Sequence, residues 1–296
     1  MRKNCFLMAT MMFVAMSMIF ASCKKEKTDD PKDPTDIPLV YTLTVLSSNE
    51  EMGTVTGGGS YEVGTEVTLT ATPTSEGYAF VKWSDENTDN PRTLTVTGNT
   101  ELTAIFDYAA VDLGLPSGLK WATCNVGAAN PEEYGNYYAW GETATKETYD
   151  WSNYFDTSDG GSTFTKYTID GKTVLELADD AVRANWGGAW RMPTDTEWTE
   201  LRTNCTWTWT SDYNGTGVAG RIVTSNINGN SIFLPAAGYR SLGDLYFAGD
   251  YGCYWSSSLN TDNPGNAWNV YFNSDYVDRG NNGRYFGLSV RPVLGE

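Results

Sequence analysis

Side chains that can bind a ligand by stacking and hydrogen bonding are concentrated in residues 239–285, which contain seven Asn, seven Tyr and five Asp. Tyrosine offers flat contact area at a small entropic cost, and short amides and carboxylates add adaptable hydrogen bonds. Turn formation accounts for some of these residues. In 268–273, however, Asn and Tyr alternate with Trp268, Val270 and Phe272, which in a strand places the apolar set in the core. We therefore predict a ligand-binding surface of Asn269, Tyr271, Asn273, Asp275 and Tyr276, with Asn260 nearby.

The chain contains no histidine. This excludes a Ser-His-Asp or Cys-His catalytic unit, a zincin helix, and zinc or haem held by imidazole. Acid and base chemistry is left to carboxylates, Lys, Tyr and Cys. With no histidine, and with no pair of cysteines near the C-terminus, we predict no catalytic residue, no cofactor and no enzymatic activity.

Three cysteines follow the N-terminal region: Cys124, Cys205 and Cys253. They allow one disulfide and one free thiol in any of three pairings, or three buried, unreactive thiols. The flanks of Cys253 are Gly252 and Tyr254, which supply no positive charge to stabilise a thiolate. The sequence leaves these alternatives open.

The net charge is −17 and the isoelectric point is about 4.3. Such a chain repels phosphate backbones, so we predict no nucleic-acid partner. Anionic lipid head groups are disfavoured for the same reason.

Residues 1–22 have the pattern of a signal peptide, with Arg2 and Lys3 ahead of an apolar run that is too short for a comfortable membrane span. The run ends at Phe20-Ala21-Ser22-Cys23, which resembles the lipobox of bacterial lipoproteins. The resemblance implies that Cys23 carries acyl chains such as palmitate and becomes the mature N-terminus. An ordinary secretory signal is the alternative.

Residues 23–40 are charged and proline-rich, so we predict a disordered tether. Its acidic residues Glu26, Asp29 and Asp30 resemble the signal that sends Bacteroidetes lipoproteins to the outer face of the outer membrane. The predicted location is therefore the outer membrane, lipid-anchored and exposed at the cell surface.

Residues 41–107 alternate apolar and polar positions with period two, as in Val67, Leu69 and Ala71, and are interrupted by glycine and proline. This pattern predicts a small all-β unit. The amino-acid sequence of the whole stretch resembles the divergent internalin-B-type repeat of bacterial surface proteins. This resemblance implies a spacer between a membrane anchor and a head domain.

Residues 108–296 hold the predicted helices, one at 175–186 and a second that begins with a capping box at Thr194 to Glu197. Alternating strands are predicted at 206–210 and 268–273, and a last strand places Phe286, Leu288 and Val290 on one face.

Five ordered blocks in this region resemble the Fibrobacter succinogenes major paralogous domain, which is related to the formylglycine-generating, sulfatase-modifying family and to the C-type lectin-like fold. They are LGLPSGLKWATCNVGA (113–128), YYAWGE (137–142), WGGAWRMPTDTEWTELR (186–202), YWSSS (254–258) and GLSVRPV (287–293). The resemblance implies an α+β C-type lectin-like domain with two helices and a twisted antiparallel sheet. It also implies an irregular segment near the C-terminus that carries ligand-contacting loops.

The active members of these relatives depend on residues that this chain lacks. Formylglycine-generating enzymes need a cysteine pair near the C-terminus, and only Cys253 lies there. Sugar-binding C-type lectins place acidic triplets on calcium, whereas Asn269 is followed by Val270 and Pro264 by Gly265. We predict no metal in the ligand site, with a structural calcium in the Asp and Asn loops left open.

The sequence thus predicts a surface lipoprotein whose head binds a protein or glycan ligand non-covalently, as an adhesin does. Two alternatives remain: a periplasmic or surface enzyme that processes glycans or carries out oxidation, and a structural subunit of a surface appendage.

Cys23→Ser should abolish lipidation, because the acyl chains are attached through the thiol and supply the membrane affinity. The expected product is a soluble or uncleaved protein that an alkyne fatty acid does not label. Labelling of the Ser variant at the level of the parent protein would contradict the lipobox prediction.

Overall fold

The computed structural model describes residues 37–168 and 170–295. Residues 40–296 form one compact unit, to which every helix and strand given below belongs. The predicted signal peptide, the lipidated Cys23 and the tether up to residue 36 lie outside the described residues. Within the described ranges, no helix is long and apolar enough to cross a membrane.

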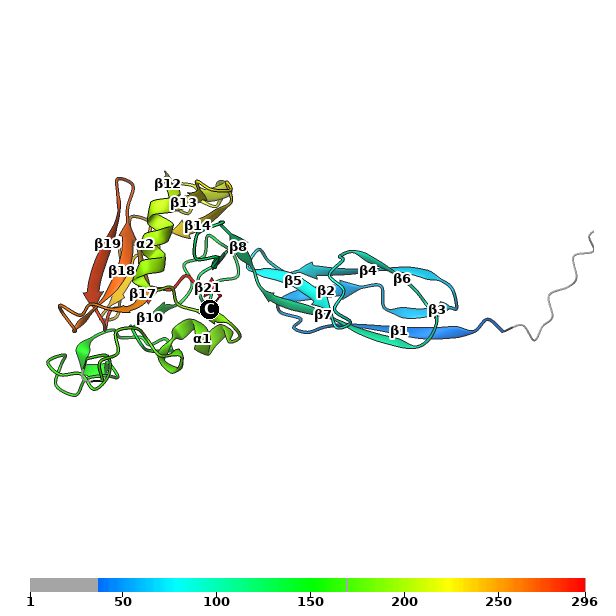
Figure 1. The fold of residues 1–296 in the computed structure, drawn as a ribbon, viewed down its shortest axis with the longest axis horizontal. Coiled ribbons are helices and arrows are strands. Elements are labelled where there is room, and N and C mark those ends of the chain that lie inside the picture. The colour runs from blue at the N-terminus through cyan, green and yellow to red at the C-terminus, as the bar shows by residue number, and fades with distance from the viewer. Residues whose placement is uncertain (1–36, 169, 296) are drawn as a thin grey trace, which may run out of the picture. The chain divides into compact units, whose positions relative to one another are not determined.

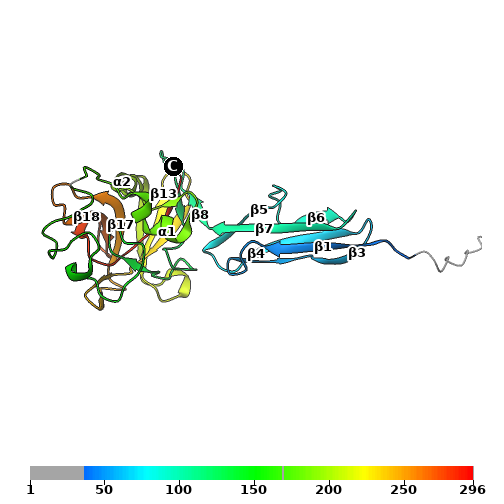
Figure 2. The ribbon, with the colours of Figure 1, turned by 90° about the horizontal axis from the view of Figure 1, so that it is seen from below.

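Strands from Val40 to Tyr108 form two sheets that share one core (Figures 1 and 2). One sheet has the order β3-β1-β7-β5, in which β1 and β7 run parallel and the other neighbours antiparallel. The other has the order β2-β4-β6 and is antiparallel. The strands are β1 (Val40–Ser47), β2 (Gly53–Thr56), β3 (Gly59–Glu62), β4 (Glu66–Pro73), β5 (Tyr78–Trp83), β6 (Arg92–Thr95) and β7 (Thr100–Tyr108).

Period-two alternation builds the core of this unit, as the sequence predicts, because each strand turns one face inward. Leu69 and Ala104 are buried from opposite sheets, and Trp83 is fully enclosed between them. The indole N–H of Trp83 donates to the carbonyl of Asp89 at 3.0 Å, so its only polar group is satisfied. Gly53 is required beside Phe106, because a Cβ there would lie 2.2 Å from the phenyl ring.

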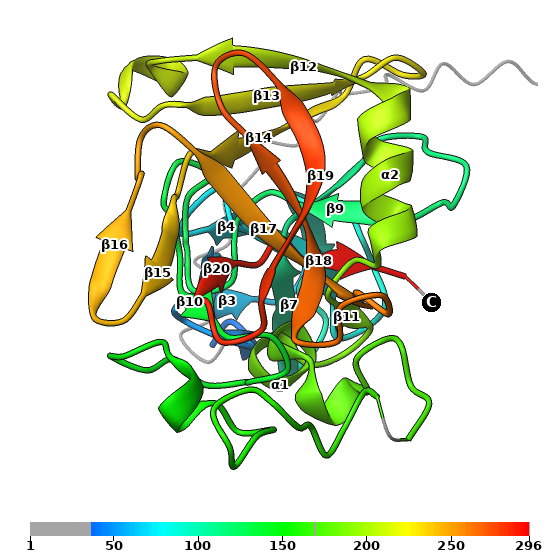
Figure 3. The ribbon, with the colours of Figure 1, turned by 90° about the vertical axis from the view of Figure 1, so that its left-hand side faces the viewer.

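The remaining strands form four further sheets among the described residues (Figure 3). The largest has the order β10-β20-β17-β18-β19 and is antiparallel except between β17 and β20, so the predicted antiparallel sheet is in fact mixed. The strands are β8 (Ala110–Asp112), β9 (Lys120–Ala122), β10 (Tyr137–Tyr138), β11 (Trp190–Arg191), β12 (Cys205–Thr210), β13 (Gly220–Ser225), β14 (Ser231–Pro235), β15 (Tyr239–Ser241), β16 (Asp244–Tyr246), β17 (Gly252–Leu259), β18 (Asn266–Phe272), β19 (Val277–Gly283), β20 (Leu288–Ser289) and β21 (Val293–Leu294).

The helix predicted at 175–186 is shorter than expected. A 3-10 turn covers Leu177–Asp179, and α1 covers only Ala181–Trp186. Asp180 separates them, because its carboxylate accepts the backbone N–H groups of Val182 and Arg183 at 2.8 and 3.1 Å and so caps a new helix. The predicted end at Gly187 is confirmed, with φ of 71°.

The second helix, α2 (Asp195–Asn204), begins with the predicted capping box. The Thr194 hydroxyl accepts from the N–H of Glu197 at 3.3 Å, and the Glu197 carboxylate accepts from the N–H of Thr194 at 2.7 Å. Arg191 forms a two-pronged ion pair with the same carboxylate. Trp198 and Leu201 then bury one face of the helix.

The longest irregular stretch of the described chain runs from 139 to 180, between β10 and α1, with 3-10 turns at Trp151–Asn153 and Leu177–Asp179. The family resemblance implied such a stretch near the C-terminus, where the chain instead forms strands. Asp156 holds this stretch in place. Its carboxylate accepts the backbone N–H groups of Thr165 and Lys166 and pairs with Arg284 at 2.9 Å, with both charged groups fully buried.

Both faces of the largest sheet are buried at β17 and β18, which corrects the prediction of one inward and one outward face. Val270 and Phe272 pack into one apolar cluster, while Ala267 on the opposite face packs into another. Asn269 shares that second face and is only 2% exposed, although we predicted it at the surface. Trp268, predicted in the core, is only partly buried and is covered by the Arg279 guanidinium at 3.3 Å from its ring centroid.

Thr194→Ala should lower the free energy of unfolding by about 1 kcal/mol, because the N–H of Glu197 loses its cap. Thr203→Ala is the matched control at an exposed position of the same helix and should change stability by less than about 0.5 kcal/mol. Urea unfolding of the two variants checks this. If both lose the same free energy of unfolding, the cap adds no stability beyond that of an ordinary exposed threonine.

Candidate ligand-binding site

An open pocket of about 550 Å³ lies against the β17–β18–β19 part of the largest sheet. Its volume is in the range of sites that hold small ligands. The β15–β16 hairpin lies beside β17 (Figure 3), where Gly238 pairs with Gly252. Tyr239 of β15 and Phe247 and Tyr251 of the loop that follows the hairpin line the pocket on this side. The lining residues are Tyr239, Phe247, Tyr251, Cys253, Tyr271, Arg279, Gly280, Asn281 and Asn282.

Aromatic rings form most of one wall of the pocket. Phe247 contacts Tyr251 edge-on at 5.4 Å between ring centroids and Tyr239 at 5.9 Å. Tyr246 lies against Tyr239 at 5.6 Å. Phe247 is 52% exposed, which is unusual for a large apolar ring. This wall therefore offers stacking surface that nothing in the described chain covers.

The backbone around these rings is strained. Leu242 and Phe247 have φ of 53° and 56°, a left-handed conformation that costs energy for residues with a Cβ. Phe247 is held there by its own carbonyl, which accepts from the N–H groups of Asp250 and Tyr251. Local strain that the surrounding structure maintains is typical of binding sites.

A second wall is polar and comes from β18 and β19. Arg279, Asn281 and Asn282 of β19 line it. The Asn269 amide N–H donates to the side-chain oxygen of Asn282 at 2.6 Å and so positions that side chain. Asn269 itself is buried behind Gly280 and does not line the pocket, and its side-chain oxygen has no hydrogen-bond partner among the described residues.

Two of the predicted residues meet at this pocket. Tyr271 lines it and Tyr276 contacts the Tyr271 ring at 5.6 Å. Partial desolvation and a hydrogen bond with Tyr251 raise the pKa of Tyr276. Tyr276 is 43% exposed and so lies at the rim. Asp275 is exposed in the same turn but is not among the lining residues.

Asn260 and Asn273 use their side chains in turns, and neither residue lines the pocket. The Asn260 side chain is buried and accepts the backbone N–H groups of Asp262 and Asn263. Asn273 accepts those of Asp275 and Tyr276 in the β18–β19 connection. Asn side chains commonly stabilise turns in this way.

Sequence reasoning missed Tyr239, Phe247 and Tyr251 as individual residues, although every lining residue falls inside the Asn- and Tyr-rich segment 239–285. The amino-acid composition of this segment was the available signal for these lining residues. It does not show that the hairpin folds back over β17, because that contact is tertiary.

The three cysteines of the described chain are free and buried. Cys253 lines the pocket, but burial in apolar surroundings raises the pKa of its thiol to about 12. Burial likewise raises the pKa of Cys205 to about 11 and that of Cys124 above its usual value. Of the alternatives that the sequence left open, the structure therefore favours three free, buried thiols.

No group of three or more acidic or cysteine side chains comes close enough to hold a metal ion within the described ranges. Asp159, in the irregular stretch, uses its carboxylate to accept the backbone N–H groups of Ser162 and Thr163. A hydrogen bond from the Thr163 hydroxyl at 2.6 Å contributes most, and together these bonds lower the pKa of Asp159 to about 2.

Two domain families match parts of the chain. Residues 41–110 match the divergent InlB B-repeat domain, so the chain contains such a repeat, ending at 110 where we predicted 107. Residues 209–293 match a domain of unknown function, DUF8237, and include the whole lining of the pocket. Neither the curated proteins nor the solved structures gave a match.

Alkylation should detect the protonated state of the Cys253 thiol. Because the thiolate is the reactive form, we expect slow labelling by iodoacetamide at pH 8 and a rate that rises up to about pH 12. Peptide mapping separates the three sites, and unfolded protein provides the reference rate. Rapid labelling of Cys253 in the folded protein at pH 7 would contradict the assignment.

Proposed function

We propose that this protein is a surface lipoprotein whose head, residues 108–296, binds a protein or glycan ligand non-covalently in the pocket between the β15–β16 hairpin and the β18–β19 strands. The observation that carries the proposal is the exposed aromatic wall opposite a polar wall formed by Arg279, Asn281 and Asn282. Aromatic faces with hydrogen-bonding edges suit both sugar rings and protein side chains.

The chemistry of the lining favours binding over catalysis. It includes neither a carboxylate nor a histidine, and its thiol is protonated. General acid-base catalysis needs a group that titrates near the working pH, and nucleophilic catalysis needs an activated nucleophile. The proposed role is therefore that of an adhesin and not of an enzyme.

The remaining parts of the proposal concern placement and fold. The lipobox at Cys23 supports an acyl anchor in the outer membrane, and the divergent InlB B-repeat supports a spacer before the head. The C-type lectin-like assignment is supported by the two helices and by the burial of key residues from the resembling blocks. Those residues are Trp121, Trp140, Trp190, Trp255 and Arg291.

A test uses the purified full-length chain on glycan and protein arrays, followed by affinity measurement for the ligand found. Tyr251→Ala should weaken binding by about 2 kcal/mol, on the order of 30-fold in Kd, because a stacking ring is lost. Phe155→Ala removes an exposed ring outside the pocket and should leave the affinity unchanged.

Melting curves of both variants separate lost contacts from lost folding. Conversion of an array ligand into product, abolished by changing one carboxylate, would overturn the proposal in favour of an enzyme. If Tyr251→Ala binds the ligand with the same affinity as the parent protein, the ligand does not bind in this pocket.

A further inference from the structure

A second pocket, of about 610 Å³, lies on the other side of β15. Tyr239 lines the first pocket and Arg240 the second, as expected of consecutive strand residues, which point to opposite faces. Backbone hydrogen bonds in both directions between Arg240 and Gly287, at 2.7 and 2.9 Å, fix this part of the strand. Tyr137, Thr145, Lys146, Glu147, Thr148 and Tyr149 also line this second pocket.

The Arg240 guanidinium has no anionic partner in the part of the chain that the structure describes. It is partly buried, and its recorded contact is the face of the Tyr137 ring at 5.4 Å. Arg221 and Arg291 also lack a carboxylate, but each donates to backbone carbonyls. Arg240 lines the pocket, and within the described chain its guanidinium has neither a hydrogen-bond acceptor nor an ion-pair partner.

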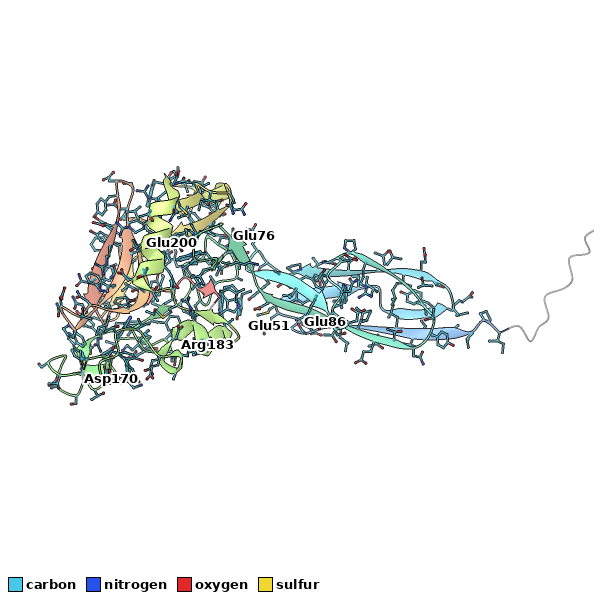
Figure 4. The ribbon with its side chains drawn as sticks, in the orientation of Figure 1. Glu51, Glu76, Glu86, Asp170, Arg183 and Glu200 are labelled. Atoms are coloured by element: carbon cyan, nitrogen blue, oxygen red, sulfur yellow. The ribbon has the colours of Figure 1, made fainter. Side chains whose placement is uncertain are left out.

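The other charges of this pocket leave Arg240 as the group that can attract an anion. The Lys146 ammonium is neutralised by Glu142 at 2.9 Å. Glu147 is exposed, so water screens its charge more than that of the half-buried Arg240. Much of the remaining surface is acidic, as Glu51, Glu86 and Asp170 illustrate (Figure 4), so attraction of an anion here is local.

The floor and rim suit a sugar ring. Tyr137 and Tyr149 are buried beneath the pocket, and the hydroxyls of Thr145 and Thr148 stand exposed at its edge. Arg binds a carboxylate through two parallel hydrogen bonds, and neighbouring hydroxyls can serve the ring hydroxyls of the same ligand.

We propose that this second pocket binds an acidic sugar residue, with Arg240 holding its carboxylate. The site extends the proposed function by naming an acidic glycan as ligand class, but it does not depend on the first pocket. Arg240 supplies charge and orientation, while the tyrosine floor and threonine rim select a ring over a simple carboxylate.

Titration of the full-length protein with sodium glucuronate, glucose and glutamate tests the proposal by calorimetry. Glucuronate should bind at least about tenfold more tightly than either of the others, and the affinity should fall as salt is raised. Arg240→Gln should weaken glucuronate binding by at least about tenfold, and Arg240→Lys should restore part of it because only the charge returns. Glu147→Gln should strengthen binding by removing a repulsive charge.

Lys120→Gln is the matched control, since it removes an exposed cation that lies outside the pocket. If glutamate binds as tightly as glucuronate, the proposal that the pocket selects a sugar ring is wrong. If Arg240→Gln binds glucuronate as tightly as the parent protein, the proposed binding site is wrong. Tyr251→Ala should leave glucuronate affinity intact. If it abolishes binding while Arg240→Gln does not, the sugar occupies the first pocket, which would overturn this inference and support the proposed function.

Discussion

The buried guanidinium of Arg291 is the constraint around which the core of residues 108–296 is organised. The side chain is fully enclosed and has no carboxylate partner among the described residues. Burying a charge without neutralising it is costly unless every donor is satisfied. Arg291 meets this demand with the carbonyls of Ala122, Thr123 and Phe233 and the side-chain oxygen of Asn125. Segments far apart in sequence must therefore present their oxygens to one point.

The need to satisfy the hydrogen-bond donors of Arg291 also constrains the positions of the strands that line the pockets. Arg291 lies two residues after the end of β20. That strand pairs with β17, and β17 in turn pairs with β18. Trp255 of β17 donates its indole N–H to the carbonyl of Tyr138, and Trp198 of α2 donates to the carbonyl of Trp255. Both faces of the sheet centre are thereby filled with apolar side chains. The open positions are left at the β18–β19 end and under the β15–β16 hairpin, where the pockets form.

The sequence predicted best where one local rule decides the outcome. The capping box at Thr194 and the alternation of Val67, Leu69 and Ala71 involve neighbours along the chain or a strand with one buried face. Asn269 shows where this fails. Its amide is buried because β18 is covered on both sides and because Asn282 provides a partner across the strand pair. Polarity alone does not report such a pairing.

Part of the candidate site could likewise be predicted from the sequence, and part could not. Tyr271 and Tyr276 were identified because they lie on or next to a strand with clear alternation. Tyr239 and Phe247 reach the same pocket through a hairpin that folds back over β17, which depends on the left-handed turns at Leu242 and Phe247. A non-glycine residue in that conformation has no reliable sequence signal.

Residues that line the first pocket and residues that belong to the core alternate along the segment 239–285. On β17, Cys253 faces the first pocket while Tyr254 is fixed in the core by hydrogen bonds from Asn125 and to Pro235. Other residues that hold the fold, such as Trp121, Trp190 and Arg291, lie outside this segment. A substitution at a lining position can therefore alter the ligand surface while the core residue next to it in sequence stays the same.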